Sequence, residues 1–157
     1  MNSIIKFNDN VDTDQIIPSQ YLLLPTIEEV SKHAFEGLMP DFLKKFNNGD
    51  VLVSGNNFGC GSSREQAPQI LKQLGVTAII AKSFARIFFR NSINIGLPVI
   101  VCQKIYDNVK EGDKISLDLE KGQLTCNKKN YSFNKYPEHL MKIVKNGGLI
   151  AYLNKSR

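Results

Sequence analysis

Between residues 54 and 68 the chain combines the side chains and the backbone freedom needed to bind a small anion. The segment reads Ser-Gly-Asn-Asn-Phe-Gly-Cys-Gly-Ser-Ser-Arg-Glu-Gln-Ala-Pro and leads from an apolar strand into a predicted helix. Glycines before a helix let the backbone bend and point several N–H groups at one anion, which the helix dipole also attracts. Arg64, predicted in the first helical turn, is unfavourable there unless an anion compensates its charge, and its planar fork suits a carboxylate. We therefore expect a carboxylate or phosphate site.

The same segment does not match the familiar nucleotide or hydrolase motifs. It lacks the Gly-Lys-Ser or Gly-Lys-Thr of a phosphate-binding loop, and Arg64 stands where the dinucleotide fingerprint needs its third glycine. The second glycine of a nucleophile elbow is also missing. Ser63 and Gln66 have the spacing of a capping box, which predicts the helix start. A capped helix after a flexible turn, without a ligand, is the alternative interpretation.

Two further segments have weaker chemical meaning. Residues 9–18 place Asp at alternate positions, as a calcium loop does, but they lack the glycine and the distal acid of that loop. The alternative is a set of turn-forming residues before a short strand. Residues 83–96 predict a helix that ends at Gly96, with its aromatic side chains in the core or at an interface.

Histidine and cysteine are too few and too scattered for the common catalytic or metal sites. His33 and His139 each fall on a predicted amphipathic helix, which argues against a Ser-His-Asp hydrolase. Cys60, Cys102 and Cys126 have neither the spacing of metal ligands nor the even number of a disulfide framework. We expect this chain to bind no metal.

The elements that must position these residues alternate along the chain. Apolar runs rich in β-branched residues predict strands at 4–7, 51–54, 78–81, 97–102, 114–119 and 149–153. Helical periodicity predicts helices at 27–35, 41–46, 64–74, 84–93 and 138–145. The alternation from 51 to 102 is typical of parallel strands with helices on the sheet faces, whereas 118–133 predicts short antiparallel strands around Gly122.

Length and composition are those of one globular domain. The 157 residues are 42% hydrophobic and carry a net charge of +5. The basic excess lies after residue 120, in a segment that contains eight Lys or Arg residues and one acidic residue. We interpret this dispersed charge as a solvated face and expect no nucleic-acid partner. The chain has no apolar run of membrane-spanning length and no signal peptide at its start, so we expect a cytoplasmic protein without a membrane partner.

Three segments in this order resemble one family. They are Asp-Thr-Asp-Gln-Ile-Ile-Pro at 12–18, Asn-Phe-Gly-Cys-Gly-Ser-Ser-Arg-Glu at 57–65, and Ser-Phe-Ala-Arg-Ile-Phe-Phe-Arg-Asn at 83–91 followed by Gly-Leu-Pro at 96–98. Residues 4–102 resemble the small subunits of 3-isopropylmalate dehydratase in the aconitase superfamily, and the short length resembles the archaeal-type branch. The resemblance implies one domain over residues 1–157, an α/β swivelling domain of the aconitase C-terminal type with three β/β/α layers. Its central sheet would be mostly parallel, with an added antiparallel β-layer.

The resemblance also implies a reaction and roles in it. Such a chain is a hydro-lyase subunit of leucine biosynthesis that interconverts 2-isopropylmalate and 3-isopropylmalate with a large subunit, whose cysteines hold a [4Fe-4S] cluster. This chain would bind no cofactor. By analogy Ser62 is the base, Arg64 clamps a substrate carboxylate, and Asp14 orients Arg64 or the serine. Ser63 and Gly61 would bind the substrate. Stabilisation by helix N–H groups and Arg64 is needed because a serine hydroxyl is a weak acid.

Leu22, Leu23 and Leu24 predict the type of substrate. Three leucines before Pro25 are unusual in a connecting loop, and packing into the core or under the next helix is one explanation. The resemblance implies instead a loop over the substrate side chain, where homoaconitase-type relatives carry an arginine about where Leu23 stands. We expect an apolar diacid such as isopropylmalate. The alternatives are a homoaconitase or a methylmalate/citraconate-type dehydratase, a stand-alone carboxylate-binding module, and a purely structural subunit.

Overall fold

A computed structural model describes residues 1–156, and a seven-stranded mixed sheet is the central feature of this part of the chain. The strands are β1 (Asn2–Lys6), β2 (Val51–Ser54), β3 (Ala78–Ala81), β4 (Val99–Val101), β5 (Lys114–Asp118), β6 (Gln123–Cys126) and β7 (Lys129–Ser132). Across the sheet their order is β4-β3-β2-β1-β5-β6-β7. Neighbours among β1 to β4 are parallel, and β1 pairs with β5 in antiparallel fashion to begin the second half.

Short helices lie in the connections between the strands, and two more follow the last strand β7. They are α1 (Thr13–Ile16), α2 (Ile27–Ser31), α3 (Phe42–Lys45), α4 (Gln66–Leu74), α5 (Arg86–Asn94), α6 (Gln103–Tyr106), α7 (Glu138–Lys145) and α8 (Leu149–Lys155), with the 3-10 turn η1 at Ser19–Tyr21. Helices α4 and α5 are the crossovers from β2 to β3 and from β3 to β4. Within residues 1–156 no helix has the length and apolarity that crossing a membrane requires.

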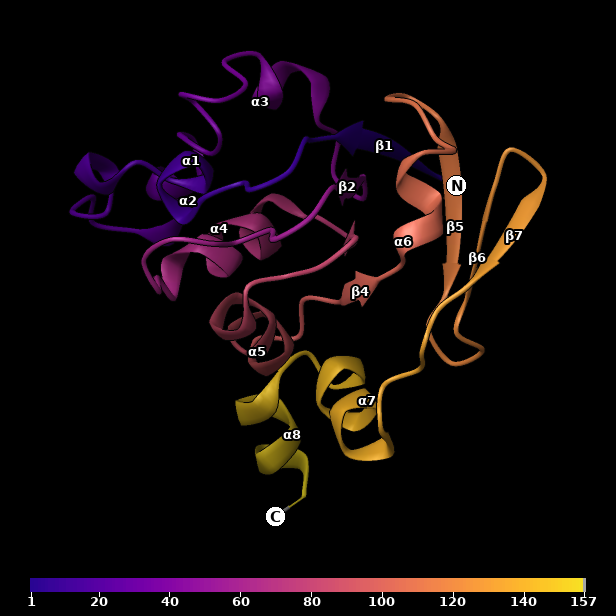
Figure 1. Cartoon of the computed structure of the whole chain (residues 1–157). Helices are drawn as coiled ribbons and strands as arrows, with labels where there is room; N and C mark the ends of the chain where they lie inside the picture. The colour runs from indigo at the N-terminus through magenta and orange to yellow at the C-terminus, as the bar shows by residue number, and fades with distance from the viewer. Residues whose placement is uncertain (157) are drawn as a thin grey trace.

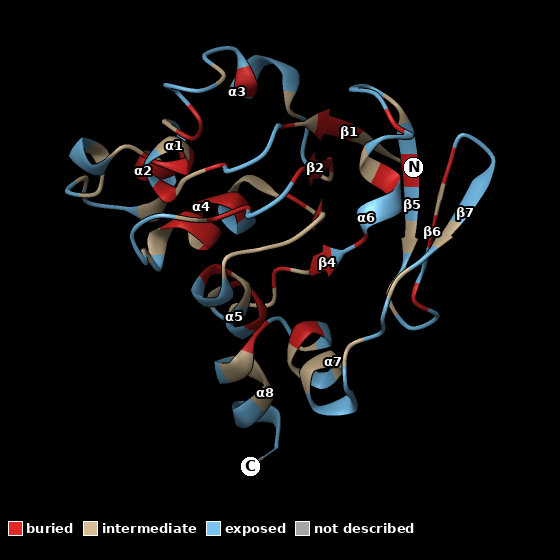
Figure 2. Ribbon diagram, viewed as in Figure 1, coloured by how far each residue is buried: buried red, intermediate tan, exposed pale blue. Residues whose placement is uncertain are grey.

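The parallel strands β2, β3 and β4 are almost entirely apolar, and β1 is apolar at Ile4 and Ile5, because both faces of this part of the sheet are covered. Leu52 and Ile79 belong to the core on the helical side, whereas Val53 and Ile80 belong to a second core that includes Leu124 of β6. Figure 1 shows α4 and α5 on one side of the parallel strands and β5, β6 and β7 on the other. β2 is buried over its whole length, whereas β1 is buried at Ile4 and Ile5 and β4 at Val99 and Ile100; Figure 2 shows these parts in red. The predicted β/β/α three-layer architecture is confirmed, and the antiparallel layer continues the central sheet through β1 and β5.

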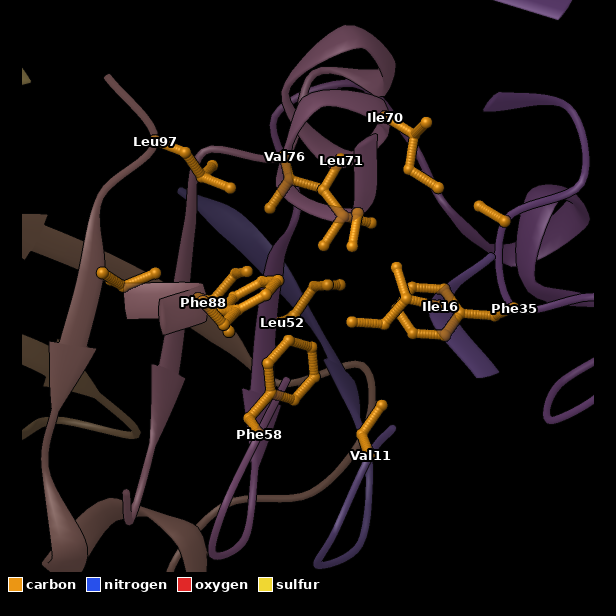
Figure 3. Packing of buried hydrophobic residues seen from close by; sticks show 14 of the residues in the cluster. Val11, Ile16, Phe35, Leu52, Phe58, Ile70, Leu71, Val76, Phe88 and Leu97 are labelled. Atoms are coloured by element: carbon orange, nitrogen blue, oxygen red, sulfur yellow. The ribbon is translucent and has the colours of Figure 1, made fainter. Parts of the chain in front are cut away.

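The core on the helical side is closed by aromatic rings next to the strands. Phe58 and Phe88 meet edge to face with their ring centroids 5.3 Å apart, and Figure 3 shows both beside Leu52. Phe58 follows β2 and Phe88 lies on α5, so this contact fixes α5 over the loop that leaves β2. The functional segments of the sequence therefore meet where that loop passes under α5.

One predicted strand is wrong. Residues 149–153 form the helix α8, with Leu149, Tyr152 and Leu153 at helical spacing. A strand there would have to pair with β4 or β7, the two edge strands of the sheet. At β4 the Val99 N–H already donates to the Tyr136 hydroxyl over 2.9 Å, and the Val99 carbonyl accepts from the same hydroxyl.

Several predicted helix boundaries are also wrong, for local reasons. The helix predicted at 27–35 ends as α2 at Ser31, and the chain then turns to Phe35, which has a left-handed φ of 57°. The helix predicted from 84 begins at Arg86 because Phe84 still pairs with Phe58 in an isolated parallel bridge. The other predicted helices shorten to α3 and α4, the strands shift by one or two residues to β1, β4 and β5, and α7 has the predicted bounds.

Candidate functional site

A cavity of about 310 Å³ lies where the loop after β2 meets the starts of α1 and α5. The loop contributes Gly59, Gly61, Ser63 and Arg64, and α1 contributes Thr13. The start of α5 supplies the other side, with Ala85, Arg86, Ile87, Phe88 and Asn91. All three segments that carry the family resemblance therefore border one cavity, although they are far apart in the sequence.

Two glycines allow the loop to pass this closely under its neighbours. Gly59 has a φ of 84°, and a Cβ there would stand 2.3 Å from Cγ of Phe88. Gly61 has a φ of 89°, and a Cβ there would stand 2.3 Å from a carboxylate oxygen of Asp12. Both conformations are strained for other residues, and both spaces are already filled. Glycine at 59 and 61 therefore brings α5 and α1 against the loop.

The start of α1 is tied to the loop by hydrogen bonds. The Asp12 side chain accepts from the N–H of Asp14 over 2.7 Å, and the Gln15 side chain accepts from the N–H of Asp12 over 3.0 Å, so the two form a capping box. The Thr13 N–H donates to the Cys60 carbonyl, and the Thr13 hydroxyl donates to the Ser62 carbonyl over 2.7 Å. These bonds fix the backbone of residues 60–62 relative to α1.

The capping box predicted at Ser63 and Gln66 is wrong. Helix α4 begins at Gln66, its N-cap is Glu65, and no side chain caps it. Arg64 accordingly lies before the helix rather than in its first turn. The sequence contained a second capping box, Asp12 with Gln15, which organises α1 instead.

Arg64 is held in place by the segment that contains α1. Its guanidinium forms an ion pair with Asp14 and donates to the Ile17 carbonyl over 3.0 Å, and only 16% of its side chain is exposed. A guanidinium has five N–H donors, so two fixed contacts leave others free to face the cavity. Asp14 is thus placed to orient Arg64, and the positive charge of Arg64 already has a partner.

The backbone around the predicted serines offers further donors. Within residues 1–156 the N–H groups of residues 61 to 64 donate no hydrogen bond to the protein. Ser62 and Ser63 are both exposed, and Ser63 lines the cavity. Ser62 lies between the two lining residues Gly61 and Ser63, but its own side chain is not part of the cavity wall. Four free N–H groups beside a fixed arginine form a site that suits an anion.

The three leucines of the predicted substrate loop lie apart from this cavity. Leu22 and Leu24 are half-buried and pack against the core on the helical side, whereas Leu23 is 92% exposed. None of the three lines the cavity. The segment is connected to the site just before the leucines, because the Ile17 carbonyl accepts a hydrogen bond from the Arg64 guanidinium.

Thr13, Arg86 and Asn91 line the cavity but were not predicted to do so. For residues 83–96 only the aromatic side chains were assigned, to the core or an interface, and Phe88 does lie in the core. The polar residues beside Phe88 were given no role. A signal was available in the sequence. Arg86 is the first residue of α5, so the argument about a cation at a helix start applies to Arg86 rather than to Arg64.

The three cysteines lie in two different places. Cys102 and Cys126 are buried in the core between the parallel and the antiparallel halves of the sheet, and Cys60 lies half-buried beside the cavity. Burial, with a smaller contribution from the Asp12 carboxylate, raises the pKa of the Cys60 thiol. In residues 1–156 no group of three or more His, Cys, Asp or Glu could hold a metal ion, so these side chains do not suit an iron–sulfur cluster.

Comparison with known proteins gives one consistent family. The model of the aconitase C-terminal domain matches residues 3–104. The chain is 48% identical to the 3-isopropylmalate dehydratase small subunit of Clostridium acetobutylicum over 97% of this chain and 94% of the relative, and 51% identical to that of Hydrogenobaculum sp. over 98% and 94%. A crystal structure of 3-isopropylmalate dehydratase from Methanocaldococcus jannaschii superposes with a TM-score of 0.93 at 43% identity, covering 99% of this chain and 93% of that one.

Proposed function

Because the chain belongs to the aconitase C-terminal domain family, and within it to the small subunits of 3-isopropylmalate dehydratase, we propose how its cavity serves that hydro-lyase. The reaction interconverts 2-isopropylmalate and 3-isopropylmalate by removing and re-adding water in leucine biosynthesis. This chain contributes the part of the active site that binds a carboxylate and moves a proton. The observation that supports this most strongly is Arg64, fixed by Asp14 and the Ile17 carbonyl beside four free N–H groups.

Carboxylate binding is the first role of the cavity. Arg64 donates to one carboxylate of the substrate, and the N–H groups of Gly61 and Ser63 donate to the same anion. The pairing with Asp14 keeps the guanidinium in one orientation, so little freedom is lost when the substrate binds. A bidentate arginine–carboxylate contact also fixes the direction of the carbon chain.

Proton transfer is the second role, and we assign it to Ser62. Its hydroxyl is exposed beside the cavity, and its backbone is held by the hydrogen bond from Thr13. A serine alkoxide requires stabilisation, which the free N–H groups of the loop and the nearby Arg64 provide. Ser62 removes the proton from the carbon next to the bound carboxylate and returns a proton in the reverse direction.

The remaining part of the active site belongs to a second chain. The cysteines of this chain do not suit an iron–sulfur cluster, so we assign the [4Fe-4S] cluster to the large subunit. We further propose that residues 1–157 act as one domain without a nucleic-acid or membrane partner, and that the heteromer works in the cytoplasm. The pairing of β1 with both β2 and β5 supports the single domain.

Reconstitution with the large subunit tests this function. The wild-type complex is expected to interconvert the two isopropylmalates, and Ser62→Ala is expected to lower kcat by roughly 100-fold to 10,000-fold, the usual range for loss of a general base. Ser116→Ala, an exposed serine on β5, is the matched control and is expected to keep the wild-type rate. Circular dichroism and co-elution with the large subunit show whether each variant folds and assembles.

Two results would contradict the proposal. A wild-type complex that assembles but leaves both isopropylmalates unchanged would remove the proposed reaction. A Ser62→Ala complex with a wild-type rate would remove Ser62 from proton transfer and leave Ser63 as the next candidate. Arg64→Lys separates the binding role, because a point charge cannot replace the planar fork and should raise KM more than it lowers kcat.

A further inference from the structure

Three large apolar side chains on α5 and α8 are exposed. Ile87 of α5 lines the cavity and is 45% exposed, and Ile150 and Leu153 of α8 are 77% and 47% exposed. Ile150 and Leu153 are three residues apart, so they share one face of α8. The two helices are in contact, and Figure 1 shows α8 beside α5. We refer to these three residues together with Asn91 and Asn94 of α5 as the α5–α8 surface.

A second hollow connects α8 to the cavity. It has a volume of about 230 Å³ and lies between α4, α5 and α8. Its lining residues include Glu65, Asn91, Asn94, Leu149 and Ile150. Asn91 lines both the cavity and this hollow, and it is four residues from Ile87 on the same face of α5. The α5–α8 surface therefore extends from the cavity wall along α5 to α8.

The composition of the α5–α8 surface is that of an interface between proteins. Single exposed apolar residues are ordinary, whereas a group of them beside a binding site marks a surface that a partner covers. The side chains of Asn91 and Asn94 form no hydrogen bond within residues 1–156, so their amides can pair with polar groups of a partner. Apolar anchors next to unpaired amides match the buried centre and the polar border of such interfaces.

We propose that the α5–α8 surface docks the large subunit that carries the [4Fe-4S] cluster. The inference rests on the proposed function, because that function needs a second chain to bring the cluster to the cavity, and the surface begins in the cavity wall. A second copy of this chain would cover the cavity without completing the site, since residues 1–156 contain no group of side chains that suits the cluster. The docking face of the large subunit is expected to be apolar opposite Ile150 and Leu153.

The affinity between the two subunits gives the first test. Ile150 and Leu153 do not line the cavity, so substitutions there separate docking from catalysis. Ile150→Asp suits the start of α8 and Leu153→Lys suits its last turn, because each charge complements the helix dipole. Both are expected to raise Kd for the purified large subunit of 3-isopropylmalate dehydratase from the same organism by roughly 10-fold or more, because each buries an unpaired charge in the interface. At saturating large subunit, kcat is expected to stay as in the wild type.

The controls are matched in residue type, exposure and charge. Leu43 is a leucine of α3 that is 41% exposed and lines neither hollow, so Leu43→Asp and Leu43→Lys are expected to keep the wild-type Kd. The two variants on α8 carry opposite charges, so a loss of affinity in both cannot come from the sign of the charge. Isothermal titration calorimetry measures each Kd, and circular dichroism shows that each chain is folded.

Hydrogen exchange maps the contact in the wild-type chain without any substitution. When the large subunit is added, the amides of α5 and α8 are expected to exchange more slowly, whereas those of α3 and β7 keep their rates. Protection that is confined to the loop at residues 59–64 and to α1, with α8 unchanged, would overturn the proposal. Sedimentation of the chain alone tests the other occupant. If Ile150→Asp abolishes a dimer of this chain and leaves Kd for the large subunit unchanged, the surface binds a second copy and the proposal is wrong.

The outcomes also separate docking from the proposed function. A wild-type complex that forms through α8 but leaves isopropylmalate unchanged would remove the proposed reaction and keep the docking surface. A complex that converts isopropylmalate, and in which Ile150→Asp and Leu153→Lys both keep the wild-type Kd, would keep the reaction and remove the docking surface. An equal rise in Kd for the α8 variants and the Leu43 variants would remove it as well, because a nonspecific effect of surface charge would then suffice.

Discussion

Asp12 shows how one carboxylate can organise several parts of a site. Its oxygens cap α1 and fill the space that a side chain at position 61 would need, and its negative charge contributes to the raised pKa of the Cys60 thiol. Asp12 itself does not line the cavity. Asp12 nevertheless decides where Thr13, Asp14 and the loop backbone lie, so the chemistry of Arg64 depends on a residue outside the cavity wall.

The reactivity of Cys60 should follow from its surroundings. Burial and the Asp12 carboxylate raise the pKa of the thiol, and the thiolate is the reactive form, so alkylation should be slow at neutral pH and should accelerate only above the range of a free cysteine. Asp12→Asn removes the charge but keeps a capping side chain, so the rate at a given pH should rise. Iodoacetamide labelling at a series of pH values, read by mass spectrometry at Cys60, measures both effects.

Labelling of Cys60 in Asp12→Asn needs a control for a nonspecific effect of surface charge. The Asn8→Asp variant places a carboxylate elsewhere on the exposed surface and should leave the Cys60 profile unchanged. A wild-type profile with its midpoint at or below that of free cysteine would contradict the assignment of a raised pKa.

At the scale of residues, the sequence predicted one side of the cavity. Gly61 and Arg64 were identified from local patterns, because glycines before a helix and a cation beside them leave signals within a few positions of each other. The roles of Ser63 and Asp14 came from the family resemblance, since the capping box predicted at Ser63 is wrong. For Arg86 the local signal, a cation at a helix start, was present, but its place beside this cavity depends on Phe88 packing over Gly59, a long-range contact that no local pattern contains.

At the scale of elements, the loop between α1 and α2, which contains the three leucines, is held against the core at two points. Tyr21 stacks on His33 with ring centroids 3.6 Å apart, and Leu22 and Leu24 pack against the core, so the loop is anchored on both sides of Leu23. Of the three leucines only Leu23 is exposed, at 92%. Leu23 is also the position at which the family resemblance implies a contact with the substrate side chain.

Substrate choice should therefore change at Leu23. An arginine there pairs with a third carboxylate, whereas leucine leaves such a charge unpaired and costly to bury. In the reconstituted complex, Leu23→Arg is expected to lower kcat/KM for isopropylmalate and raise it for the tricarboxylate homoaconitate. Leu43→Arg, at a leucine that is 41% exposed on α3, is the control and should change neither value. A wild-type complex that prefers the tricarboxylate would rule out the isopropylmalate assignment.

The edge strand β4 depends on one hydroxyl. Tyr136 donates to the Val99 carbonyl and accepts from the Val99 N–H, and burial raises the pKa of Tyr136, so the hydroxyl stays protonated across the stable pH range. Tyr136→Phe leaves both backbone groups without that partner, which should cost about 2 kcal/mol and lower Tm by roughly 4–8 °C. Calorimetry checks this.

Tyr152→Phe is the matched control for the edge contact. The Tyr152 hydroxyl makes no hydrogen bond within the described residues, so its loss should change Tm by less than about 1 °C. An equal effect of the two substitutions would show that the hydroxyl of Tyr136 does not support β4.

Local patterns explain which elements the sequence could predict. β2 and β3 have the predicted bounds because each is a short, fully buried apolar run, and α7 has them because its apolar residues recur at helical spacing. The apolar run 149–153 is compatible with a strand or a helix, and its pattern alone does not decide between them. The choice follows from long-range packing, since α8 contacts α5 and α7.

At the scale of the whole molecule, β1 is the connection between the two halves of the sheet. β1 is hydrogen-bonded to β2 on one side and to β5 on the other, and in this order no other strand joins the parallel half to the antiparallel half within residues 1–156. The family resemblance ended near residue 102, yet β5 to β7 cover the buried face of the parallel strands. The segments on either side of that limit therefore share a core.

This connection has a consequence for the time course of folding. Ser3 meets Asp50 at a separation of 47 residues and Lys114 at a separation of 111, so its second neighbour is made long after its first. At roughly 5–20 residues per second, the ribosome needs on the order of 5–20 seconds to synthesise the 111 residues from Ser3 to Lys114. During this interval the outer edge of β1 has no strand beside it and is open to pairing with other nascent chains. The first strand to be synthesised is among the last to be enclosed.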